Sequence, residues 1–155
     1  MKKKLIPVLL VFTLLLLLLG GGNVLATTDS TSRALDPVVS TSWLAANKNK
    51  VVILDVRSAD DYKAGHIPTA KSLPTPWIWE EDGTYRSMDI LDLMASGVAG
   101  EDKDKEIILY CGAGGYASSW WFLLTQQMGY KNVKFYDGSA QDWVKHNFMI
   151  AYLYS

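Results

Sequence analysis

The sequence has few residues able to perform nucleophilic, metal or redox chemistry. Its 155 residues contain one cysteine, Cys111, and two histidines, His66 and His146. A single cysteine excludes both an intramolecular disulfide and a two-cysteine redox motif. Two histidines far apart in the sequence give little support for a metal site or for a histidine-activated protease nucleophile. We therefore predict no metal and no bound cofactor, and any nucleophilic chemistry should centre on Cys111.

Excess charge of either sign is also missing. The chain has 15 basic and 16 acidic residues, for a formal net charge of −1. Nucleic-acid binding calls for a basic patch or stripe, which this composition does not provide. We therefore expect no nucleic-acid partner.

One long apolar run is present, at the N-terminus. Residues 2–4 are lysines, residues 5–19 are almost entirely apolar, and Val24-Leu25-Ala26 is typical of a signal-peptide cleavage site. The run is short for a membrane span, which needs about 20 residues. The pattern predicts an exported protein, periplasmic or secreted after cleavage near Ala26; the alternative is an uncleaved membrane anchor. The predicted division is 1–26 signal peptide, 27–37 polar linker and 38–155 one domain.

Apolar runs of strand length alternate with helical patterns over the rest of the chain. The predicted strands are 38–39, 51–56, 71–73, 107–110 and 133–136. The predicted helices are 42–47, 59–64, 87–96, 117–128 and 140–147. Gly65, Gly97 and Gly129 fall where three of these helices should end. The alternation predicts an α/β fold with a mainly parallel central sheet and helices on both faces.

Cys111 begins a glycine-rich turn between a predicted strand and a predicted helix. Glycines allow successive main-chain amides to bend toward the sulfur, and the start of the helix adds unpaired N–H groups. Both features stabilise a thiolate, so we predict a nucleophilic cysteine. The alternative is a small buried apolar residue, a common role for a free cysteine. The predicted anion-binding loop is Gly112, Ala113, Gly114, Gly115, Tyr116 and Ala117.

Two other segments follow predicted strands and should reach the same edge of the sheet. Asp55 and Arg57 lie at the end of strand 51–56, and Asp137 follows strand 133–136. The carboxyl ends of parallel strands share one edge, where ligands bind in such sheets. We interpret Asp55, Arg57 and Asp137 as structural residues of this rim. No arginine or lysine follows Cys111 before Lys131, which argues against a cysteine phosphatase.

Two motifs resemble those of the rhodanese-like sulfurtransferases, over residues 38–145. The first is Leu54-Asp55-Val56-Arg57, followed by Asp61-Tyr62 and by Gly65-His66-Ile67-Pro68, with Thr69 in place of the usual glycine. The second is Tyr110-Cys111-Gly112-Ala113-Gly114-Gly115-Tyr116-Ala117-Ser118. The resemblance implies a rhodanese-like α/β domain in which Cys111 takes sulfane sulfur from a small-molecule donor as a persulfide. The acceptor would be cyanide or a thiol, including a protein thiol.

The loop is most similar to that of the catalytic half of thiosulfate/3-mercaptopyruvate sulfurtransferases, but it differs at three positions. The thiosulfate-using branch commonly has a cation where this loop has Gly112 or Tyr116, and the mercaptopyruvate branch has hydroxyl residues where it has Ala113 and Tyr116. Arg86 is the candidate cation for a donor carboxylate; the alternative is a solvated surface arginine. A polysulfide or protein persulfide therefore remains an equal candidate donor. Two alternative functions stay open: a catalytically weak binding module, and a thiol redox sensor or carrier.

Overall fold

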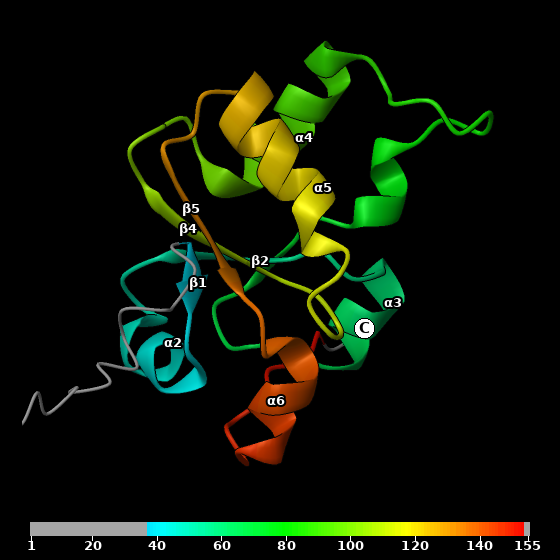
Figure 1. Ribbon diagram of the computed structural model, residues 1–155. Coiled ribbons are helices and arrows are strands. Elements are labelled where there is room, and N and C mark those ends of the chain that lie inside the picture. The colour runs from blue at the N-terminus through cyan, green and yellow to red at the C-terminus, as the bar shows by residue number, and fades with distance from the viewer. Residues whose placement is uncertain (1–36, 154–155) are drawn as a thin grey trace, which may run out of the picture. The chain divides into compact units, whose positions relative to one another are not determined.

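Five strands pair into one sheet in the computed structural model, which describes residues 37–153 (Figure 1). The strand order is β1-β5-β4-β2-β3, and every pairing between strands is parallel. The strands are β1 (Val38–Val39), β2 (Val52–Asp55), β3 (Lys71–Ser72), β4 (Glu106–Tyr110) and β5 (Asn132–Tyr136). The predicted α/β class and parallel sheet are confirmed. The predicted signal peptide, residues 1–26, lies outside the described residues.

The helices cover both faces of this sheet (Figure 1). They are α2 (Thr41–Asn47), α3 (Ala59–Ala64), α4 (Met88–Ala99), α5 (Ala117–Phe122) and α6 (Ser139–Lys145), with a short 3₁₀ helix η1 (Thr75–Ile78) and a π-helical segment η2 (Leu123–Gln127). Helices α4 and α5 lie on one face, and α2, α3 and α6 lie on the other. Within residues 37–153, no helix has both the length and the apolar character needed to cross a membrane.

The central strands are apolar throughout because both of their faces are covered. Alternate residues of a strand point to opposite faces. Leu54 and Leu109 accordingly pack with α4 and α5, whereas Ile53 and Ile108 pack with α2 and α6. This arrangement explains why the sequence shows continuous apolar runs here instead of the alternation of a half-exposed strand.

Helix α4 is longer than predicted. Gly97 was expected to end a helix at about residue 96, but the helix continues to Ala99 and ends at Gly100, whose φ is +90°. Val98 and Ala99 pack against the core, and this apolar contact extends the helix past Gly97. The cost of one glycine in a helix, about 1 kcal/mol, is smaller than the gain from burying such side chains.

The helix after the cysteine loop changes type part-way along. One helix over residues 117–128 was predicted, but the α-helical hydrogen bonding gives way to π-helical bonding after Phe122. The hydroxyl of Thr125 donates to the main-chain oxygen of Trp121 at 2.8 Å, an acceptor that an α-helix would use for its own backbone. The amide of Met128 then donates to the oxygen of Leu123, five residues earlier, at 3.0 Å.

The C-terminal segment folds back onto the turn after α3. Ala151 and His66 exchange two main-chain hydrogen bonds, each of 2.9 Å. The indole of Trp143 donates to the oxygen of Met149 at 3.0 Å, and its ring lies against Phe148. These contacts make the C-terminal segment part of the domain as far as Ala151.

Candidate functional site

Cys111 directly follows β4, and its backbone is bonded to the segment that follows β5. The Cys111 amide donates to Oγ of Ser139 at 3.2 Å, and that hydroxyl donates to the oxygen of Tyr136 at 3.0 Å. The carbonyl of Cys111 accepts the amide of Ala140, in the first turn of α6, at 3.0 Å. The ends of two neighbouring strands and the start of α6 are thus joined at the cysteine.

One main-chain amide of the loop donates to the cysteine sulfur. The N–H of Gly114 lies 2.9 Å from Sγ of Cys111, measured between the heavy atoms. The sequence predicted a ring of several amides; among the described residues, this is the one amide that reaches the sulfur. Gly114 has a φ of +95°, and a Cβ placed there would lie 2.8 Å from Oδ1 of Asp137. Only glycine fits this position without a shift of its neighbour.

Cys111 lines a pocket of about 1100 Å³. Cys111 itself is only 1% exposed, so its sulfur is almost completely buried beside this pocket. The predicted convergence at the carboxyl edge of the sheet is confirmed, because residues after β2, β4 and β5 meet here. The lining residues are Val56, Arg57, Ser58, Asp61, Thr75, Pro76, Cys111, Gly112, Ala113, Gly115, Tyr116, Ala140, Gln141, Val144 and Lys145.

The predicted loop residues take different places around this pocket. Gly112, Ala113, Gly115 and Tyr116 line it, whereas Gly114 carries the amide donor and Ala117 is buried in the core. Tyr116 is 73% exposed, and Thr75 of η1 donates to its carbonyl oxygen at 3.3 Å. The ring of Tyr116 therefore stands at the rim and leaves the pocket open.

Asp55, Arg57 and Tyr110 form a network beneath the rim. The guanidinium of Arg57 grips Asp55 through Nε and Nη2, at 2.9 and 2.5 Å, and Nη2 also donates to the oxygen of Gly65 at 2.7 Å. The phenol of Tyr110 donates to Asp55 at 2.6 Å and accepts the amide of Ile67 at 3.1 Å. These bonds join the end of β2 to the turn after α3.

The network raises the pKa of two of its members, Tyr110 and Arg57. Burial raises the pKa of Tyr110, and the negative charge of Asp55 raises it further, so the phenol stays a neutral donor. Burial alone would lower the pKa of Arg57, but the hydrogen bond and the charge of Asp55 outweigh it and raise the value. A charged Arg57 and a neutral Tyr110 suit a structural role for this network.

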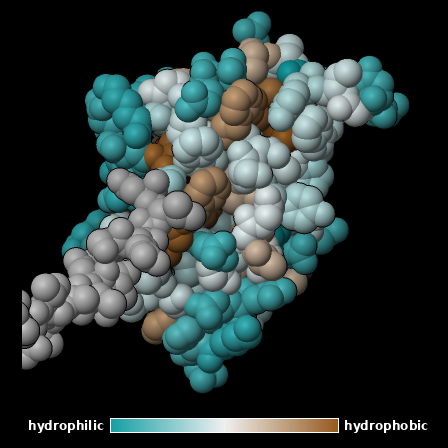
Figure 2. Space-filling view, viewed as in Figure 1, coloured by the Kyte–Doolittle hydropathy of each residue, from teal (hydrophilic) through white to brown (hydrophobic). Residues whose placement is uncertain are grey.

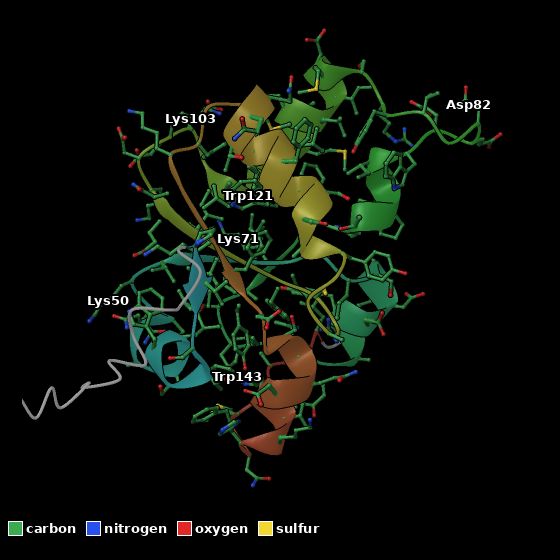
Figure 3. The ribbon with its side chains drawn as sticks, in the orientation of Figure 1. Lys50, Lys71, Asp82, Lys103, Trp121 and Trp143 are labelled. Carbon is green, nitrogen blue, oxygen red and sulfur yellow. The ribbon has the colours of Figure 1, made fainter. Side chains whose placement is uncertain are left out.

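Arg86 is not brought to the pocket, in contrast to its prediction as a possible substrate contact. Its Nε donates to the oxygen of Trp77 at 2.8 Å, and its Nη1 lies 3.9 Å from Glu80. The connection in which it lies folds back on itself, with the rings of Trp79 and Tyr85 4.4 Å apart and Asp82 at the tip, away from α6 (Figure 3). This local packing turns Arg86 toward its own segment.

His66 also lies outside the pocket. Its Nδ1 is 2.8 Å from the oxygen of Tyr62, and its ring stacks on that of Tyr62 at 3.8 Å. Among the described residues, no three side chains of His, Cys, Asp and Glu gather in a group that could hold a metal ion.

Residues 40–146 match the sequence model of the family described as the rhodanese-like domain. The chain belongs to the rhodanese-like family. The resemblance inferred from the two motifs is thereby confirmed.

Two curated relatives show which rhodanese-like proteins are similar in sequence. A protein of Saccharopolyspora erythraea, whose provisional name is thiosulfate sulfurtransferase, is 37% identical over 120 residues, covering 67% of this chain and 40% of that protein. The sulfur carrier protein TtuD of Thermus thermophilus is 33% identical over 131 residues, covering 74% of this chain and 46% of that protein. The chain thus spans less than half the length of either relative.

Solved structures share the rhodanese-like fold. The 3-mercaptopyruvate sulfurtransferase SseA of Escherichia coli superposes with a TM-score of 0.64 at 18% identity, covering 76% of this chain and 51% of that one. The human single-domain sulfurtransferase TSTD1 superposes with a TM-score of 0.52 at 21% identity, covering 70% of this chain and 96% of that one. At these identities the likeness is one of fold.

Sequence reasoning on this rhodanese-like chain missed the contribution of α6 to the pocket. Gln141, Val144 and Lys145 line it, yet none of them belongs to either motif. The sequence did contain a pattern that predicts this contribution. Gln141 and Lys145 are four residues apart and share a helix face, and α6 follows β5, which ends at the rim. The motifs drew attention to the loop instead.

Proposed function

We propose that this rhodanese-like domain transfers sulfane sulfur through a persulfide on Cys111. The observation that supports it most is the N–H of Gly114 aimed at Sγ of Cys111, 2.9 Å away, in a residue that lines a pocket. The names of the sulfurtransferase and sulfur-carrier relatives favour the same chemistry.

The reaction divides into two displacements at sulfur. The Cys111 thiolate attacks the outer sulfur of the donor, an Sγ–S bond forms, and the donor's own bond to that sulfur breaks with its electron pair. An acceptor thiolate or cyanide then attacks the outer sulfur of the persulfide and releases the Cys111 thiolate. The Gly114 amide stabilises negative charge on sulfur before and after transfer, as a charge-assisted donor. Both steps are displacements by anions, so neither requires a side-chain base.

A binding module without catalysis is the second candidate, and the burial of the sulfur favours it. Cys111 is 1% exposed, so a donor can reach its sulfur only if the cysteine loop moves. The third candidate, a thiol redox sensor or carrier, would form mixed disulfides through the same sulfur. Persulfide formation followed by turnover separates the sulfurtransferase from both.

The test is a donor screen read by the intact mass of the protein. Mixing the chain with thiosulfate, 3-mercaptopyruvate or inorganic polysulfide should add one sulfur atom with at least one of the donors. The addition should disappear in Cys111→Ser, and cyanide should remove it from the wild type as thiocyanate. Failure of all three donors to load the protein would overturn the proposal.

Export is proposed on separate grounds, from the pattern of residues 1–26, which lie outside the described structure. Expression with a homologous secretion system should give a protein whose first residue follows Ala26, read by N-terminal sequencing. Recovery of the uncleaved chain in the membrane fraction would instead support the anchor.

A further inference from the structure

Helix α6 is built into the cysteine site through its own backbone. The amide of Ala140 donates to the oxygen of Cys111 at 3.0 Å, and that of Gln141 donates to the oxygen of Gly112 at 3.3 Å. These bonds use the first turn of the helix to hold the loop. The side chains further along α6 therefore have a fixed relation to the sulfur.

One face of α6 forms a wall of the pocket. Ala140, Gln141, Val144 and Lys145 all line it together with Cys111. Gln141 and Lys145 are one helical turn apart, which places their Cα atoms about 6 Å apart along the axis. Lys145 thus lies one turn beyond the part of the wall that touches the loop.

Among the described lining residues, Lys145 is the cation that no ion pair holds. Of the charged lining residues, Arg57 is bound to Asp55, and Asp61 accepts a hydrogen bond from Ser58 at 2.7 Å. Lys145 makes no hydrogen bond or ion pair with any residue in the part of the chain that the structure describes. Lys145 is exposed at the wall of the pocket, and its charge also acts on that of Asp142, three residues earlier. Because no ion pair holds its ammonium group, Lys145 is suited to bind an anionic ligand.

The size and lining of the pocket indicate what kind of anion fits. Its volume is about 1100 Å³, and Val56, Pro76, Ala113 and Val144 supply an apolar surface. Pockets that hold organic ligands measure roughly 300–1,000 Å³ and are mostly apolar with a few polar groups. A small inorganic dianion would leave most of this volume unfilled. Figure 2 shows apolar side chains in separate patches on the face in view, not in one broad surface for a protein partner.

We propose that Lys145 is a specificity-determining residue that binds the carboxylate of an organic persulfide donor while its outer sulfur meets Cys111. This inference rests on the proposed sulfur transfer. The Cys111 thiolate attacks the outer sulfur of R–S–SH, the Sγ–S bond forms, and the donor's S–S bond breaks. The electron pair leaves with R–S⁻, and the proton stays on the transferred sulfur. The Cys111 sulfur is oxidised and the inner sulfur of the donor is reduced, so no further reactant is needed.

The test compares two donors that differ only in charge. The rate of sulfur loading is measured by intact mass with N-acetylcysteine persulfide and with the persulfide of its methyl ester. Lys145→Gln should lower the loading efficiency with the acid about tenfold and leave that with the ester unchanged, since one charge-assisted hydrogen bond is lost. Lys145→Arg should retain the wild-type preference. The matched control, Lys105→Gln, removes an exposed lysine outside the pocket and should change neither rate.

A second measurement separates this inference from the transfer reaction. S-methyl-N-acetylcysteine has the carboxylate but no sulfur to transfer, and its affinity for the full chain can be measured by NMR titration. It should bind the wild type about tenfold more tightly than Lys145→Gln. If no donor loads the wild type but this difference holds, the sulfurtransferase proposal fails and only the binding of a carboxylate by Lys145 stands. Equal binding to both proteins, or equal loss of loading with acid and ester, would overturn the role of Lys145.

Discussion

Replacing Gly114 with alanine should reduce sulfur loading at Cys111 at least tenfold, because a hydrogen bond to the charged sulfur, worth about 1.5–3 kcal/mol, is lost. The residue has a φ of +95°, where a side chain is strained by about 1–3 kcal/mol. The new Cβ would also lie 2.8 Å from Oδ1 of Asp137. The loop must shift to relieve both, and the N–H that now lies 2.9 Å from Sγ turns away. The loading rate of the variant is followed by intact mass with the donor that loads the wild type.

The loop provides its own matched control for this experiment. A Cβ placed at Gly112 has nothing within 4 Å, and that residue has no left-handed φ. Gly112→Ala should therefore load sulfur at close to the wild-type rate. The double variant Gly114→Ala with Asp137→Ala removes the clash but keeps the strained φ, and it should recover only part of the lost rate. Equal rates for Gly114→Ala and Gly112→Ala would show that the amide does not assist the sulfur.

The parts of the fold that could be predicted are those decided by local chemistry. Ser40 and Ser58 accept the amides of Trp43 and Asp61 as N-caps of α2 and α3, as short polar residues before a helix do. The central strands were evident because burial on both faces requires an unbroken apolar run. The cysteine turn was evident because three glycines within four residues are typical of a tight turn.

The parts that could not be predicted depend on particular side-chain contacts. The π-helical segment is accompanied by the Thr125 hydroxyl bonded to the main-chain oxygen of Trp121, a contact that no spacing rule shows. Arg86 looked available, but the packing of its own connection turns it toward Glu80. Thr69 stands where the family usually has glycine, and it adopts a φ of +74°, with its hydroxyl bonded to the oxygen of Lys48 at 2.9 Å. The positive φ explains why the family usually has glycine here. The threonine of this chain makes a hydrogen bond to Lys48, 21 residues away in the sequence.

Removing the Asp55 carboxylate should be the most destabilising change at the site. Asp55 is 0% exposed and Arg57 only 15%, so Asp55→Ala leaves a poorly hydrated guanidinium and a Tyr110 hydroxyl without an acceptor. Breaking a buried ion pair by removing one partner costs about 3–5 kcal/mol. We expect a loss near 3 kcal/mol, because Arg57 keeps some contact with water and its bond to the oxygen of Gly65. The free energy of unfolding is measured by urea titration.

The control is an aspartate in an ion pair that water already surrounds. Asp60 lies 3.6 Å from Lys63, and its side chain is 96% exposed, so Asp60→Ala should cost less than about 1 kcal/mol. Tyr110→Phe, which deletes the buried hydroxyl but leaves the ion pair, should fall between the two. Since Tyr110 and Arg57 both depend on Asp55, the effects of Asp55→Ala and Tyr110→Phe should add to more than the double variant loses. Strict additivity, or equal losses for Asp55→Ala and Asp60→Ala, would mean that the turn after α3 is held by the packing of the C-terminal segment and not by this network.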